Sequence, residues 1–203
     1  GAPAAPAPDK AIASNRDDAD LRAARRKAPP SPNSPRGYRG LVLADLNPKN
    51  AFKDELVADI GPLGIWVYEQ MTWTQISGTN PDWIMAAALN NGPKQALIVD
   101  LGAAGLWTWS HDGYPGAWTQ ISGNNAEWAI VLDDDNDKRQ ELHVVFGTPP
   151  GVWRYEETDG RRDWKQISSR NPEAGLRTAL NPGGPEAGGY VFPGAGFWSL
   201  AFA

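Results

Sequence analysis

The chain has 203 residues, a formal net charge of −5 and no cysteine. This length suits one domain with a tail, and the acidic balance argues against a nucleic-acid-binding protein, which needs a basic face. Without cysteine neither disulfides nor thiolate metal sites are available, and no window approaches the roughly 18 consecutive apolar residues of a membrane span.

Residues 1–37 differ in composition from the rest of the chain. Residues 1–8 are rich in Ala and Pro, and prolines recur in 28–35. Such segments favour extended conformations and cannot bury a core. Between them, residues 15–27 predict a short helix, with acids near its start and bases near its end, as the helix dipole favours. We expect an N-terminal arm that is either a solvated linker or a segment that orders on a partner. Its small-residue start is compatible with the mature end left by signal-peptide removal.

Residues 38–203 contain a repeated unit. The motif Trp-x-Gln-Ile-Ser begins at Trp73, Trp118 and Trp164, at spacings of 45 and 46 residues. A fixed period of that size indicates a repeated supersecondary unit. The units are expected at about 38–81, 82–126, 127–172 and 173–203. The fourth unit follows the same pattern but lacks the motif.

Each unit holds short apolar or alternating runs separated by Gly, Pro, Asn and Asp. In the first unit these runs are 41–44, 56–61, 64–68 and 73–77. Runs of this length that end in turn residues predict strands. Four strands in roughly 40–50 residues match one blade of a β-propeller. We therefore predict an all-β fold: a β-propeller-like array of about four four-stranded blades, the last one incomplete, with an extended N-terminal arm.

The loop 133–141 predicts a calcium site. Its acids fall at positions 1, 3, 5 and 9: Asp133, Asp135, Asp137 and Glu141. Calcium takes about six to eight oxygens, and alternate residues of a turning loop point the same way. The loop lacks the glycine and the last carboxylate of an EF-hand. The alternative is a solvated acidic hairpin tip, partly neutralised by Lys138 and Arg139. Equivalent loops in the other units are poorer in acids, so a bound calcium ion would be structural.

Most of the ten tryptophans recur at equivalent positions. One set is Trp66, Trp107, Trp153 and Trp198, and another is Trp73, Trp118 and Trp164. Recurrence in the units predicts packing between blades, because Trp fills such space well. Trp83, Trp128 and the unpaired Trp109 do not recur in every unit. We expect these three to be exposed and able to stack on sugar rings.

Two acids precede repeat glycines and have two interpretations. Asp59 and Asp100 could accept hydrogen bonds from sugar hydroxyls and so contribute to ligand binding. They could equally accept hydrogen bonds from turn amides, and we favour the turn.

The units resemble two kinds of propeller repeat. An apolar strand, an Asp-rich loop, then Glu-Leu-Val-x-Asp and Gly resembles the FG-GAP, or VCBS-type, blade of integrin-α-like propellers. The sequence Gly-x-x-Gly-(Ile/Leu)-Trp-x-(Tyr/Trp), followed by Trp-Thr-Gln-Ile-Ser, is similar to tectonin-type and bacterial propeller-lectin blades. The resemblance covers about residues 38–203 and implies a propeller with calcium at the four acids of the 133–141 loop. Such families serve as lectins, adhesins and assembly domains. They usually close more blades than this chain supplies.

The motifs do not favour catalysis. The chain has no Gly-x-Ser-x-Gly elbow, phosphate-binding glycine loop or His-x-x-x-His pair, and His111 and His143 are not at equivalent positions. We therefore expect no enzymatic activity. An open array leaves exposed faces and strand edges that invite association.

The open array has three possible completions. Residues 28–40 could supply the missing outer strand, two chains could form a larger ring, or the edge could dock on a larger complex. We expect a non-catalytic structural or assembly subunit of an extracytoplasmic complex, periplasmic, secreted or at the cell surface. It would dock on a protein partner or on itself through the arm and the open blade edge. The alternative is a carbohydrate-binding, lectin-like module.

Overall fold

The computed structural model describes residues 40–47, 49, 54–89, 94–111, 116–147, 149–158, 160–178 and 184–200. The predicted N-terminal arm, residues 1–37, lies outside the described residues. The described part consists of four antiparallel sheets, which confirms the predicted all-β class. It contains no helix long and apolar enough to cross a membrane.

Each sheet is a meander in which consecutive strands are neighbours. Sheet A contains β1 (Leu41–Ala44), β2 (Glu55–Asp59), β3 (Ile65–Glu69) and β4 (Thr72–Ser77). Sheet B contains β5 (Trp83–Ala87), β6 (Ala96–Asp100), β7 (Leu106–Ser110) and β8 (Ala117–Ser122). Sheet C contains β9 (Ala126–Leu132), β10 (Glu141–Phe146), β11 (Gly151–Thr158) and β12 (Arg161–Ser168). Sheet D contains β13 (Ala174–Thr178), β14 (Ala187–Phe192) and β15 (Gly196–Leu200). Short 3₁₀ helices, η2 (Gly61–Leu63) and η3 (Gly102–Ala104), join the second and third strands of sheets A and B.

Each predicted unit therefore holds one sheet, except that Ala126, which we placed at the end of the second unit, begins β9. The strand register shows which residues are equivalent. The recurring tryptophans Trp66, Trp107, Trp153 and Trp198 pair with Ala58, Val99, Val144 and Tyr190, respectively. Since every sheet has this pairing, positions in one sheet can be matched to positions in the next.

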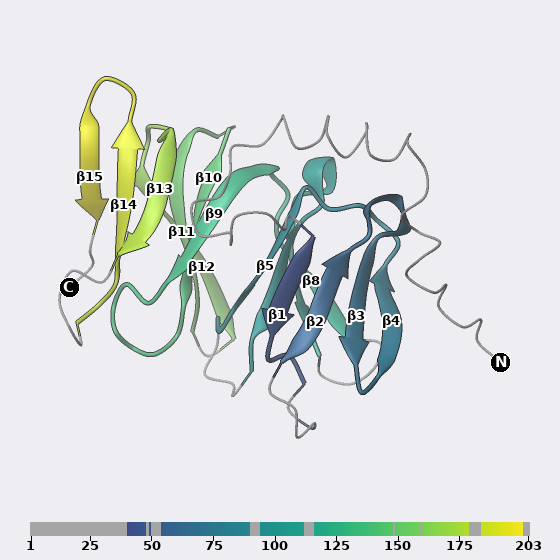
Figure 1. The fold of residues 1–203 in the computed structure, drawn as a ribbon. Helices are drawn as coiled ribbons and strands as arrows, with labels where there is room; N and C mark the ends of the chain where they lie inside the picture. Colours follow the sequence, from purple (N-terminus) through teal and green to yellow (C-terminus); the bar gives the residue numbers. More distant parts are fainter. Residues whose placement is uncertain are drawn as a thin grey trace.

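The sheets lie side by side in sequence order, with sheet D at one end and sheet A at the other (Figure 1). Three apolar clusters fill the three junctions between neighbouring sheets. Alternate residues of a strand point to opposite faces, so Leu97 of β6 packs towards sheet A while Ile98 packs towards sheet C. The buried residues described form no cluster between sheets A and D, and the described sheets do not form a closed ring.

The glutamines of the Trp-x-Gln-Ile-Ser motif fix the turn before the third strand. The side-chain amides of Gln75, Gln120 and Gln166 donate to the carbonyl oxygens of Leu63, Ala104 and Pro150, at 2.8, 3.0 and 3.0 Å. These turns bring glycine very close to the last strand. A Cβ on Gly64, for example, would lie 2.0 Å from the Ser77 carbonyl oxygen, and its φ is +76°. Only glycine fits such a position.

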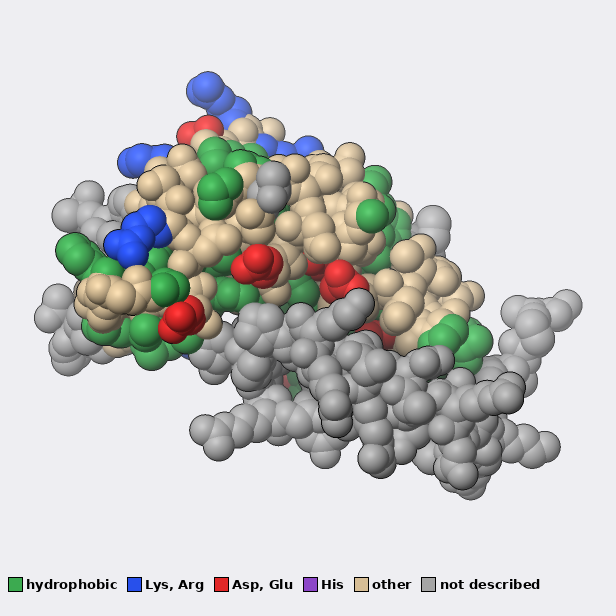
Figure 2. Space-filling view, turned by 90° about the horizontal axis from the view of Figure 1, so that it is seen from above, with side chains coloured by type: hydrophobic (Ala, Val, Ile, Leu, Met, Phe, Trp, Pro, Cys, Tyr) green, Lys and Arg blue, Asp and Glu red, His purple; other side chains and the backbone are tan. Residues whose placement is uncertain are grey.

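The face of the molecule that is uppermost in Figure 1 carries charges of both signs. Figure 2 looks down on it and shows Lys and Arg side chains towards one side, with Asp and Glu side chains nearer the middle. No continuous basic surface is seen on the part of this face that the structure describes.

Candidate functional site

Neighbouring sheets are joined by the same two hydrogen bonds where the first strand of each sheet ends. In every junction the residue after that strand accepts a backbone N–H from the residue before the next sheet's second strand. It donates its own N–H to that residue's side-chain oxygen. The pairs are Asp45 with Gln95 (2.8 and 3.0 Å), Ala88 with Gln140 (2.8 and 2.8 Å) and Asp133 with Glu186 (2.7 and 2.9 Å). We call these three pairs the clamps.

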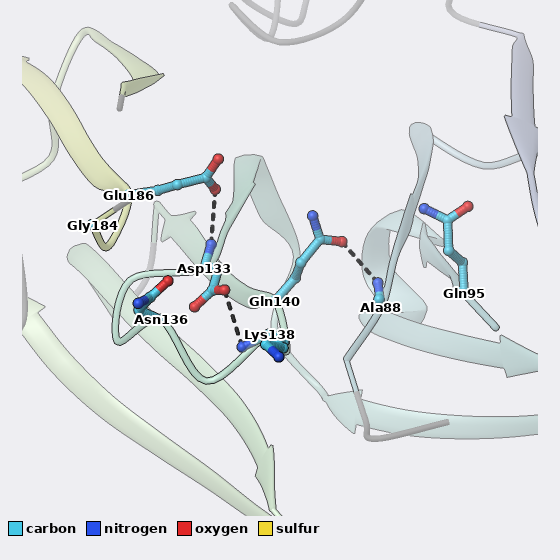
Figure 3. A pocket seen from close by; sticks show the side chains of 8 residues that line it. All are labelled: Ala88, Gln95, Asp133, Asn136, Lys138, Gln140, Gly184 and Glu186. Atoms are coloured by element: carbon cyan, nitrogen blue, oxygen red, sulfur yellow. Dashed lines mark hydrogen bonds between the residues drawn. The ribbon is translucent and has the colours of Figure 1, made fainter. Parts of the chain in front are cut away.

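A polar pocket of about 490 Å³ lies among the clamps (Figure 3). Its lining residues are Ala88, Gln95, Asp133, Asn136, Lys138, Gln140, Gly184 and Glu186. The volume falls within the range of roughly 300–1,000 Å³ of ligand pockets, but such pockets are mostly apolar. Here Gln95, Gln140 and Glu186 are already engaged in the clamps. The polar side chains that line the pocket therefore connect neighbouring sheets.

The acidic loop borders this pocket and brings three of the four predicted calcium ligands together. One oxygen from each of Asp133, Asp135 and Glu141 lies within 4.8 Å of the others. Oδ1 of Asp133 is buried without a hydrogen-bond partner, as expected for an oxygen that would bind a hard cation. Asp137 is placed differently, since its carboxylate accepts hydrogen bonds from the backbone N–H and Nε of Arg139, at 2.8 and 2.6 Å.

A positive charge already lies beside these carboxylates. Nη2 of Arg154 is 3.0 Å from Asp135 and 3.8 Å from Glu141. The loop can thus be neutralised by the protein itself as well as by a cation. Asp133 remains the position where an ion would add a missing contact.

Under the loop, sheet C buries an ionic network that sequence reasoning missed. The carboxylate of Asp134 accepts hydrogen bonds from Nε2 of His143 at 2.7 Å and from Nη2 of Arg154 at 2.7 Å. The other ring nitrogen of His143 contacts the hydroxyl of Tyr190 in sheet D. Because Nε2 donates to Asp134, Nδ1 of a neutral His143 accepts the hydrogen of Tyr190. The network therefore crosses the junction between sheets C and D.

The charges in this network stabilise one another. Burial alone would raise the pKa of Asp134, but the hydrogen bonds from His143 and Arg154 lower it to about 2. Burial lowers the pKa of His143, against the opposing effect of Asp134. Burial also raises the pKa of Glu141 to about 8, with a further contribution from the nearby Asp134 charge. The network thus combines a carboxylate, a neutral imidazole and a guanidinium.

The same positions are largely apolar in the other sheets. Register matches Asp134, His143 and Arg154 of sheet C to Leu46, Val57 and Val67 of sheet A, and to Leu89, Ile98 and Thr108 of sheet B. Sheet C has therefore replaced part of a junction core by charged groups. Departures of this kind from local rules are common at functional or specificity-determining positions.

The tryptophans predicted to bind a ligand are not exposed. Trp109 is fully buried in the cluster between sheets A and B, and Trp128 is buried in the cluster between sheets C and D. Their predicted exposure is wrong, because both rings fill junction space. Trp83 is half-buried, and its indole N–H donates to the Ala126 carbonyl at 3.2 Å.

The two acids that precede repeat glycines act in turns. Oδ1 of Asp59 accepts the N–H of Gly61 at 2.8 Å, and Oδ1 of Asp100 accepts that of Gly102 at 3.0 Å. These bonds confirm the turn interpretation. Burial raises the pKa of Asp100 to about 7 and raises that of Asp59 as well.

A second pocket, of about 170 Å³, lies at the outer end of the junction between sheets B and C. Its lining residues are Ile121, Ser122, Asn124, Phe146, Pro149, Trp153 and Trp164. Nε1 of Trp153 is buried and has no hydrogen-bond partner. The equivalent indole N–H groups of Trp66, Trp107 and Trp198 donate to the carbonyl three residues earlier, at 2.9, 2.9 and 3.0 Å. This pocket therefore has an unused donor among aromatic rings.

Comparison with protein-family models, curated proteins and solved structures finds no match for this chain. The resemblance to propeller repeats stays a prediction. Neither histidine is placed as a general base at an exposed site. His143 is fully buried, and the buried His111 lies 3.2 Å from Glu69.

Proposed function

We propose that this chain is a non-catalytic assembly module that binds protein partners through the outer faces of its two end sheets. The outer face of sheet A carries Leu41, Leu43, Leu56 and Tyr68, and that of sheet D carries Leu176, Val191 and Phe197. The observation that carries the proposal is that these faces expose positions which are buried in the internal junctions.

On sheet D the contrast is greatest at Phe197. Register matches it to Ile65, Leu106 and Val152, which are all fully buried in the three junctions. Phe197 is 59% exposed, and Leu176 on the same face is 41% exposed. Apolar side chains at junction positions favour coverage by another surface, since burying apolar area contributes about 25 cal/mol per Å².

Sheet A shows the complementary half of a junction. Leu43 is 68% exposed and Leu41 is 43% exposed. Register matches Leu41 to Ile84 of sheet B and Ala129 of sheet C, which are buried against their preceding sheets. The same face is therefore apolar in all three sheets, and on sheet A it has no preceding sheet in the described part of the chain.

The four sheets are, in this proposal, propeller blades. Their meander topology, their order in space and the contacts of β1 with β5 and of β9 with β13 support this arrangement. We further propose that the module works outside the cytoplasm, where a cysteine-free, acidic repeat domain suits a secreted or surface assembly.

Site-specific photo-cross-linking tests the assembly proposal. A photoreactive amino acid is placed at Phe197, at Leu43, or at the control position Met71, which is 88% exposed in the turn between β3 and β4. In a native extract we expect a discrete cross-linked species from positions 197 and 43 and none from 71. Adding Leu176→Glu should remove the cross-link from position 197. Cross-linking that is equal at all three positions would contradict the proposal.

A second candidate function is carbohydrate binding in the pocket beside Trp153. The observation that favours it is the buried, unpartnered indole N–H next to Trp164, Asn124 and Ser122. Aromatic faces with a few polar groups are typical of ligand pockets. Glycan-array binding that is lost in Trp153→Phe, but kept in Trp107→Phe, would support this function. An array without any bound glycan would count against it.

A further inference from the structure

We infer that the partner on these faces is a second copy of this chain, with the outer face of sheet D docked on the outer face of sheet A. This inference rests on the proposed function and names its partner. It follows from comparing the two outer faces with the three junctions that the chain already builds.

Each internal junction joins two different faces. The earlier sheet contributes the face that holds Ile65 in sheet A, Leu106 in sheet B and Val152 in sheet C. The later sheet contributes the opposite face, which holds Leu97 in sheet B and Leu142 in sheet C. The junction is therefore directional, and its two halves are not interchangeable.

The two ends of the array present one half each. Sheet D ends on the face of the earlier sheet, with Phe197 at the position of Ile65, Leu106 and Val152. Sheet A begins on the face of the later sheet, with Leu56 at the position of Leu97 and Leu142. Among the described surfaces of this chain, those of a second copy supply the matching half for both ends.

The clamps are directional in the same way as the faces. Gln95, Gln140 and Glu186 each precede the second strand of the later sheet. Asp54 precedes β2 of sheet A and is exposed at the equivalent position. In a junction between copies, the backbone of Asp54 would face the end of β13, as Glu186 faces the end of β9. The residue that would complete this pair, at position 179, lies outside the described residues.

Such an interface is heterologous, because different surfaces of the two copies meet. Heterologous contacts give a closed ring when the rotation closes and an open series when it does not. Two copies that close contain two new junctions. A substitution that disrupts one of the two outer faces in every copy is enough to prevent both the ring and the open series.

The test is the mass of the purified chain by light scattering, with Leu43→Glu and Phe197→Glu as single variants. Both side chains are exposed, so the variants should fold, and circular dichroism checks this. We expect the unmodified chain to have at least twice its 21.9 kDa monomer mass at about 100 µM. Each variant alone should have the monomer mass, and Met71→Glu should behave as the unmodified chain.

Mixing the two variants is the decisive measurement. Leu43→Glu retains an intact sheet D, and Phe197→Glu retains an intact sheet A, so an equimolar mixture can form one junction. We expect a one-to-one dimer in the mixture. A monomeric mixture overturns the inference, as does a monomeric unmodified chain or an association that survives in both single variants. If the purified chain is monomeric but positions 43 and 197 cross-link to another polypeptide, the proposed function stands and the second copy is excluded.

Discussion

The indole N–H of Trp164 in sheet C donates to the carbonyl oxygen of Ile121 in sheet B, at 3.0 Å. Both residues belong to copies of the Trp-x-Gln-Ile-Ser motif. Trp118 makes the same contact with the carbonyl of Ile76, at 3.2 Å. The motif thus ties the last strand of one sheet to the last strand of the preceding sheet.

Replacing Trp164 by Phe should reduce the free energy of unfolding by about 1–2 kcal/mol, because the change removes the indole donor and trims the ring. Urea denaturation measures the loss. Trp73→Phe is the matched control, since Trp73 has the same position on sheet A and no preceding sheet in the described structure. Equal losses in the two variants would show that the contact with the preceding sheet is unimportant.

The ionic network of sheet C should be very sensitive to the loss of one member. Asp134→Ala leaves His143 and Arg154 buried without their shared carboxylate. Breaking a buried ion pair in this way costs about 3–5 kcal/mol. Thermal denaturation of Asp134→Ala should show a correspondingly lower Tm.

Replacing the whole network should cost much less. The combination Asp134→Leu, His143→Ile, Arg154→Thr and Tyr190→Phe gives sheet C the residues that sheet B has at three of these positions. A buried ion network can often be exchanged for apolar residues without loss of stability. We expect this variant to be clearly more stable than Asp134→Ala. If it is as unstable as the single variant, the charges contribute more than their mutual compensation.

The contribution of Asp100 to stability should fall as the pH rises from about 4 to about 7, whereas His143, whose pKa is lowered by burial, has the opposite sign below its usual pKa. Asp100 has its pKa raised to about 7, mainly by burial, so the folded protein binds its proton more tightly than the unfolded chain does. Its contribution is complete below the unfolded pKa of about 4 and is lost as the pH rises through the folded value. Each pKa unit corresponds to about 1.4 kcal/mol.

Asp100→Asn should remove this contribution from the curve of Tm against pH. Some slope should remain, because the pKa of Glu141 is also raised and has the same sign. Asp134 affects stability at lower pH, because its pKa is lowered to about 2 in the folded protein. Its contribution to stability is complete above about pH 4 and is lost as the pH falls below that value. An unchanged slope in Asp100→Asn would mean that Asp100 is ionised in the folded protein.

Calcium binding at the 133–141 loop predicts that Tm rises with added calcium and falls with chelator. Asp133→Asn should remove the response, because this carboxylate offers the oxygen without a partner. Asp137→Asn is the control, since Asp137 is engaged by Arg139. A Tm that calcium does not change would show that the protein's own cations, Arg139 and Arg154, balance the loop.

The sequence was sufficient for the strands and their grouping, because apolar alternation and turn residues are local signals. Our interpretation of Trp109 as unpaired was wrong, although the motif Trp-x-(Tyr/Trp) already aligns Trp109 with Tyr68. Register matches Trp109 to Tyr68 and Tyr155, so an aromatic position recurs with a change of residue type. Trp128 is buried partly because Gly175 leaves room for it, and a Cβ there would lie 2.5 Å from the indole ring.

The ionic network could not be predicted for a different reason. His143 and Arg154 follow Asp134 by 9 and 20 residues, and the pairing of β10 with β11 brings the last two opposite each other. The sequence did contain a signal for this network. His143 stands where the first two units have Val57 and Ile98, and Arg154 stands where they have Val67 and Thr108. Aligning the units residue by residue, and not only at their motifs, would have shown both substitutions.

The clamps have a consequence for how the molecule unfolds. Each one links a sheet only to its immediate neighbour, and each apolar cluster does the same. In such linear systems stability is close to a sum of unit and nearest-neighbour terms. In a monomeric variant such as Leu43→Glu, cooperativity then decreases towards the ends, and sheets A and D should exchange amide hydrogens faster than sheets B and C. A protein built in this way can gain or lose a unit by gene duplication or deletion without redesign of the others.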